Sequence, residues 1–122
     1  MKYVRMYADS NGESHFDDVA VDFALEDYSP PTPPVNVSPF VTATRFGYVG
    51  APARLVGAWH PVPRRQMCFY LVGEMEIEVS DGEVRRFSAG SALLAEDTTG
   101  RGHVTRIVGT EGCIMAVVHL PD

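Results

Sequence analysis

The stretch that decides the fold covers residues 66–87 and reads QMCFYLVGEMEIEVSDGEVRRF. Within it, Met75, Ile77 and Val79 alternate with glutamates, and a period of two predicts a strand with one buried face. Asp81-Gly82 follows, and an Asp-Gly pair between two such runs is a strong hairpin signal. We therefore predict a strand over 66–72, a bend at Gly73 and a β-hairpin up to residue 87.

The same short period extends to both sides of this stretch. We predict further strands over residues 3–7, 19–25, 41–49, 54–59, 92–95, 103–108 and 113–120. No segment carries a convincing helical period over three turns. About eight to ten short strands separated by turn signals are typical of a β-sandwich or β-barrel.

A proline-rich segment, SPPTPP at residues 29–34, interrupts the strands. Its four prolines have no backbone N–H to donate, so the segment cannot be a central strand. We expect it to be extended and to lie at the surface or at the edge of a sheet.

The length and charge of the chain limit its class. A chain of 122 residues and 13.4 kDa predicts one domain over residues 1–122. We divide it into N-terminal strands with the proline-rich segment (1–56), a core (57–109) and a last strand (110–122). The net charge of −6, with no basic face, argues against nucleic acid and anionic membranes as partners. No stretch is long and apolar enough for a membrane helix, so we expect a soluble cytoplasmic protein.

The polar residues with the most chemical potential are two of the four histidines. His60 and His103 lie at strand boundaries beside turns, and neutral imidazole serves both as a metal ligand and as an acid–base group. We expect His15 and His119 to be structural or solvated. The two cysteines, Cys68 and Cys113, lie inside apolar runs, so we expect buried, reduced thiols.

The segment around these histidines resembles the small cupins. The first cupin motif has the form His-x-His, three or four residues, Glu, six residues, Gly, and here His60, Val62, Gln66 and Gly73 occupy those places. The second motif is matched by Gly90 and by Gly100-Arg101-Gly102-His103, with two extra residues in the intervening turn, Glu96 in place of the usual proline and Ile107 in place of the usual asparagine. The resemblance implies an all-β, cupin-type double-stranded β-helix, or jelly-roll barrel.

The resemblance also implies a divalent transition metal held by three histidines and one glutamate. This chain retains His60 and His103 as ligands, with Gln66 as a neutral third ligand and Val62 as none. Glu96 or Asp97 could supply a carboxylate and complete a two-histidine, one-carboxylate site. A metal-free pocket is the alternative, and the sequence leaves both open.

Strand parity together with the resemblance suggests one shared pocket. We hypothesise that His60, His103 and Tyr70 are catalytic, and that Trp59, Arg64 and Gln66 bind a small organic ligand. Such a pocket suits isomerase, lyase or cyclase chemistry by acid–base catalysis. A non-catalytic cupin that binds or senses a small molecule is the alternative, and a structural partner protein is a third.

The oligomeric state is predicted from the N-terminal region. The first strands and the proline-rich segment exceed what a minimal barrel needs, and exposed edge strands are commonly covered by pairing. Cupins often dimerise through such strands. We therefore expect a homodimer.

Overall fold

The computed structural model describes all residues, 1–122, and is built from strands and loops alone. The eleven strands are β1 (Lys2–Ala8), β2 (Ser14–Ala20), β3 (Ala24–Glu26), β4 (Val35–Val37), β5 (Arg45–Ala51), β6 (Gln66–Val72), β7 (Glu74–Val79), β8 (Val84–Ser88), β9 (Ala92–Ala95), β10 (His103–Val108) and β11 (Cys113–His119). No helix in the structure is long and apolar enough to cross a membrane.

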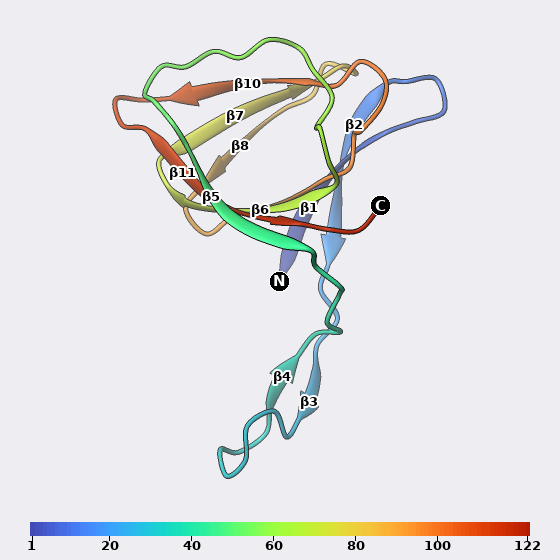
Figure 1. Ribbon diagram of the computed structural model, residues 1–122, viewed down its shortest axis with the longest axis vertical. Coiled ribbons are helices and arrows are strands. Elements are labelled where there is room, and N and C mark those ends of the chain that lie inside the picture. Colours follow the sequence, from blue (N-terminus) through green and yellow to red (C-terminus); the bar gives the residue numbers. More distant parts are fainter.

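Two sheets face each other and enclose the core (Figure 1). The larger sheet has the strand order β2-β1-β9-β6-β11-β5, and the smaller one has the order β10-β7-β8. Nearly all neighbouring strands are antiparallel, but β1 and β9 pair in parallel, although they lie far apart in the sequence.

The alternation in the deciding stretch determines which side chains enter the barrel. In β7 the glutamates are half-buried and the apolar residues between them are buried, as predicted from the period of two. β8 pairs with β7 across the Asp81-Gly82 turn, where Gly82 has φ = 98°. This left-handed conformation is one that glycine adopts at little cost.

The buried side chains form one cluster between the two sheets. Aromatic rings lie at its centre: Tyr70 stacks on Phe87 with ring centroids 5.3 Å apart, and Phe16 lies 6.0 Å from Phe87. The cluster also includes both thiol side chains, so the expectation that Cys68 and Cys113 are buried and free is confirmed.

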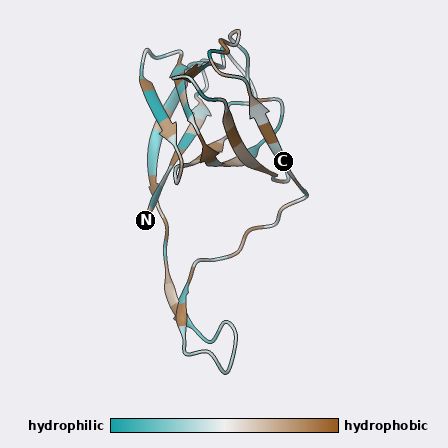
Figure 2. Ribbon diagram, turned by 90° about the vertical axis from the view of Figure 1, so that its left-hand side faces the viewer, coloured by the Kyte–Doolittle hydropathy of each residue, from teal (hydrophilic) through white to brown (hydrophobic).

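Residues 22–44 form an arm that projects away from the barrel (Figures 1 and 2). Its strands β3 and β4 pair only with each other, and the proline-rich segment forms the exposed tip. The single strand predicted over residues 19–25 is wrong, because β2 ends at Ala20 and β3 begins at Ala24. A half-buried strand with a period of two over these residues would bury Phe23 and Leu25, but both are exposed.

The strand predicted over residues 54–59 is also absent. Only isolated bridges occur there, from Val56 to Arg106 and from His60 to His103. The register changes between these two bridges, because four residues separate Val56 from His60 but only three separate Arg106 from His103, and this shift interrupts the ladder.

Candidate functional site

The structure brings His60 and His103 together, as the two motifs suggested. Their backbones exchange two hydrogen bonds of 3.0 Å, from each N–H to the carbonyl oxygen of the other residue. Side chains of directly opposed residues lie on the same face. The ring centroids are accordingly 4.8 Å apart, with an angle of 50° between the ring planes.

The side chains of His60 and His103 lie on the inner face of the barrel. His103 lies opposite Val79, and Thr105 and Ile107 follow on the same side of β10. His103 is only 6% exposed, whereas His60 is exposed, so the pair extends from the barrel interior to its rim.

A buried carboxylate orients the inner histidine. Nδ1 of His103 lies 2.6 Å from Oδ2 of Asp97, whose side chain is fully buried. Since a carboxylate only accepts, Nδ1 of His103 carries the proton, and the neutral ring keeps a lone pair on Nε2. Asp97 was considered above as a metal ligand, but it contacts the ring nitrogen on the far side from Nε2.

His60 is oriented in the same sense by the backbone. Its Nδ1 lies 2.8 Å from the carbonyl oxygen of Ala58, which can only accept a hydrogen bond. His60 therefore also keeps its lone pair on Nε2 when neutral. In both rings Nδ1 is engaged by an acceptor, which leaves Nε2 of each as the nitrogen without a protein partner.

Glycines in the turn before β10 allow this close approach. Gly102 has φ = 73°, and a Cβ there would lie 2.1 Å from the carbonyl carbon of His60. Gly100 has φ = 80° and packs against the backbone of Gly12 in the same manner. A hydrogen bond of 2.7 Å from the Ser14 hydroxyl to the carbonyl of Gly102 fixes the turn further.

The residues present do not fit the metal site of the resembled family. His60 and His103 are two nitrogen donors, but Val62, in the place of a third, is an apolar core residue that is 4% exposed. Gln66 directs its amide nitrogen to the sulfur of Cys68, 3.6 Å away. No group of three or more His, Cys, Asp or Glu side chains is arranged to hold a metal ion.

Glu96, the other carboxylate considered for that site, lies on the outside of the barrel. Its two oxygens accept hydrogen bonds from Arg5 and Arg65, at 2.6 and 2.5 Å. Partial burial acts to raise the pKa of Glu96, but the two guanidinium groups outweigh it and hold the pKa below its usual value. Glu96 therefore remains an ionised structural partner of two arginines.

Tyr70 lies in the core and does not join the histidine pair through any hydrogen bond. It is 2% exposed, and its hydroxyl donates to the sulfur of Met75 at 3.3 Å. Burial raises the pKa of this hydroxyl well above its usual value, so it stays protonated at neutral pH.

The three residues proposed to bind a ligand line three different hollows. Trp59 lies with Arg101 over one of about 410 Å³, Arg64 lies with Glu96 over another of about 530 Å³, and Gln66 lines a third. None of these hollows is lined by His60 or His103. Arg64 is exposed rather than turned inward, because Pro61 and Pro63, which precede it, break the strand parity on which its placement depended.

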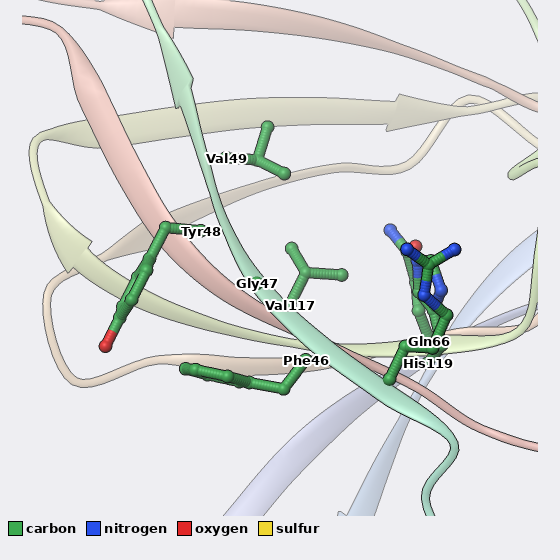
Figure 3. A pocket seen from close by; sticks show the side chains of 8 residues that line it. Phe46, Gly47, Tyr48, Val49, Gln66, Val117 and His119 are labelled. Atoms are coloured by element: carbon green, nitrogen blue, oxygen red, sulfur yellow. The ribbon is translucent and has the colours of Figure 1, made fainter.

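The hollow at Gln66 contains two polar residues that were not expected to matter. It has a volume of about 250 Å³ and is lined by Arg45, Phe46, Gly47, Tyr48, Val49, Gln66, Val117 and His119 (Figure 3). Arg45 was not singled out, and His119 was expected to be structural or solvated. Arg45 and His119 could have been identified only from the pairing register of β5, β6 and β11. That register cannot be read from the sequence until the order of the strands in the sheet is known.

Comparison with solved structures identifies the fold. No protein-family model matches the sequence, and no curated protein matches it. The cupin domain of Cnp3 from Schizosaccharomyces pombe matches with a TM-score of 0.54 and 18% identity, over 89% of this chain and 73% of that domain. A protein assigned to ethanolamine utilization in Salmonella typhimurium, protein Q, matches with a TM-score of 0.46 and 15% identity, over 99% of this chain and 96% of that one.

The sheet arrangement and the likeness to the Cnp3 domain agree with the motifs that place His60 and His103 in one barrel. At these identities the likeness concerns the fold and carries no activity with it. The chain is a small all-β protein with the cupin jelly-roll fold.

Proposed function

We propose that this protein is a small cupin enzyme that moves a proton on a small organic substrate without a metal. The observation that carries the proposal is the buried 2.6 Å hydrogen bond between Asp97 and Nδ1 of His103. A carboxylate on one ring nitrogen fixes the tautomer and stabilises the imidazolium that forms when the other nitrogen takes a proton.

In this proposal His103 is the general base. Its Nε2 takes a proton from a carbon next to a carbonyl group, and the electron pair of the broken C–H bond moves onto the carbonyl oxygen as an enolate. The imidazolium of His103 then returns a proton to the same carbon or to its neighbour, which gives exchange or isomerisation. His60 is adjacent and more exposed, so it is placed to accept a hydrogen bond from a substrate hydroxyl at the rim.

The chief alternative is a non-catalytic cupin that binds or senses a small molecule. The exposed ring of His60 and the hollow at Gln66 would serve a binder equally well. The buried Asp97 favours the enzyme, because a histidine that only binds a ligand does not need a carboxyl group that orients its ring.

Hydrogen–deuterium exchange tests the proposal without knowledge of the product. The protein is incubated in D2O with 2-oxo acids, 1,3-dicarbonyl compounds and hydroxyketones, and loss of the α-proton signal is followed by proton NMR. We expect at least one class to exchange faster than in protein-free buffer. Since a positioned base contributes about 10²–10⁴ in rate, His103→Gln and Asp97→Asn should each reduce this exchange by about 100-fold or more.

His15→Gln is the matched control, because it removes an imidazole that lies between Asp9 and Asp81 and away from the pair. It should exchange at the wild-type rate, and circular dichroism should show that all three variants are folded. Exchange at the buffer rate for every compound, together with a ligand-dependent rise in melting temperature, would establish the binder instead.

A further inference from the structure

We propose that the hollow lined by Arg45, Gln66 and His119 binds the carboxylate group of a small organic acid. This site is separate from the histidine pair and does not depend on the proton-transfer proposal.

The register of the larger sheet brings the three polar side chains together. Gln66 in β6 pairs with His119 in β11, and His119 pairs on its other side with Arg45 in β5. Residues that are directly opposed across neighbouring strands lie on the same face. Figure 3 shows Gln66 and His119 beside each other, on the same side of the sheet as Val49 and Val117.

The charge of the hollow is opposite to that of the chain. None of its lining residues is acidic, although the chain carries 16 acidic side chains and a net charge of −6. The guanidinium of Arg45 forms no ion pair, whereas Arg106 and Arg85 each bind two carboxylates of the chain. An unpaired guanidinium in an acidic protein is available to an external anion, and its fork of N–H groups matches a carboxylate.

The other two polar side chains also lack strong partners. Nδ1 of His119 is buried and has no hydrogen bond partner. The amide of Gln66 has only the weak contact with the sulfur of Cys68. A polar group without a strong partner is unfavourable, so a ligand oxygen in the hollow that accepts a hydrogen bond from the Gln66 amide would satisfy that group.

The remaining walls select the rest of the ligand. Val49 and Val117 line the hollow beside the three polar residues, and Gly47, which pairs with Val117, has nothing within 4 Å of the place a Cβ would take. The volume of about 250 Å³ suits an aliphatic or single-ring acid of a few carbon atoms. The apolar walls favour such an acid over inorganic phosphate, because phosphate has no apolar group that could pack against the valine side chains.

The probes are sodium butyrate, 3-methylbutyrate and benzoate, with butyramide as the neutral isostere and inorganic phosphate as the second anion. Binding is followed by NMR through the side-chain amide signals of Gln66 and the methyl signals of Val117. We expect at least one of the acids to shift both sets of signals, and both butyramide and phosphate to bind at least tenfold more weakly.

Arg45→Gln should raise the dissociation constant for the acid at least tenfold. Arg54→Gln is the matched control, since Arg54 is also exposed and forms no ion pair but lies outside the hollow, and it should bind like the wild type. His103→Gln should also retain binding, which separates this site from the histidine pair.

Three results would overturn the proposal: no shift at Gln66 and Val117 with any acid, equal weakening in the Arg45 and Arg54 variants, or phosphate binding as tight as that of the acids. The last result would identify a general anion site in place of a carboxylate site.

Discussion

Gly102 is the residue on which the approach of the two histidines depends. It combines a left-handed backbone with a distance to the His60 backbone that leaves no room for a Cβ atom. The hydrogen bonds between His60 and His103 run directly beside this contact. A side chain at position 102 would therefore displace one motif from the other.

We predict that Gly102→Ala lowers the free energy of unfolding by more than about 3 kcal/mol, because backbone strain and a backbone clash add. Gly82→Ala provides the control, since Gly82 also has a positive φ but a Cβ there meets nothing within 4 Å. The control should lose only about 1–2 kcal/mol. Urea unfolding of both variants measures the difference, and equal losses would show that the contact with His60 carries no strain.

At the residue scale, the sequence was sufficient to select His60 and His103 but not to define their surroundings. Both stand at motif positions beside turns, which a linear pattern can identify. Asp97 was one of two carboxylates in the same turn, and only the folded chain shows that Asp97 contacts His103 whereas Glu96 contacts Arg5 and Arg65. Arg45 belongs to no motif, and it meets Gln66 and His119 only through the register of three strands.

Among the elements, the β3–β4 arm stands apart from the barrel. A two-stranded hairpin by itself is marginally stable in water, and each of these strands has only three residues. The arm nevertheless exposes large apolar side chains, with Leu25 70% and Phe40 76% exposed. At its base lies a mostly apolar hollow of about 500 Å³ that includes Phe23, Val41 and Phe69.

The homodimer expected from the sequence stays a prediction, and the arm is the element that should form it. We expect the wild type to sediment at micromolar concentration with twice the 13.4 kDa mass of the chain, because a second copy would cover the apolar arm. The double variant Leu25→Ser, Phe40→Ser should sediment as a monomer.

Val84→Ser is a suitable control for that experiment, since Val84 is 45% exposed but lies in the smaller sheet. It should leave the mass unchanged. A wild-type protein that sediments at 13.4 kDa, or a double variant that keeps the doubled mass, would contradict a dimer formed through the arm.

Strands were predictable where the alternation continued and turns were marked. The hairpin of β7 and β8 satisfies both conditions, and the tip of the arm was correctly predicted to be at the surface because of its prolines. The alternation over residues 19–25 was misleading. A period of two shows that a strand has one apolar face, but it does not show that another part of the chain buries that face. Those apolar residues belong to the arm, and no part of the same chain buries them.

Considered as a whole, the molecule protects its thiols by enclosing them between two sheets. Burial raises the pKa of Cys68 to about 11, and it also raises the pKa of Cys113. Because the thiolate is the reactive form, only about 0.1% of Cys68 would be reactive at pH 8 even if reagents could reach it. Reaction in the native protein thus requires both deprotonation and opening of the barrel.

We predict that Ellman's reagent modifies native Cys113→Ser, which retains Cys68, at least about 100-fold more slowly than the same variant in concentrated guanidinium chloride. The native rate should rise about tenfold for each pH unit up to about pH 10, since the thiolate fraction rises in that proportion below the raised pKa. A native rate equal to the denatured one would show that β6 opens locally without global unfolding.

The parallel pairing of β1 with β9 has a consequence for synthesis on the ribosome. β1 and β2 emerge before the other barrel strands and can form a hairpin, but Val4 and Met6 pair with Leu93 and Ala95. The inner edge of the hairpin therefore stays unpaired until β9, whose Leu93 lies 89 residues after Val4, has left the exit tunnel. Contacts that are so distant in sequence also slow folding. The hairpin edge is therefore most open to chaperone binding during translation of the segment between the arm and β9.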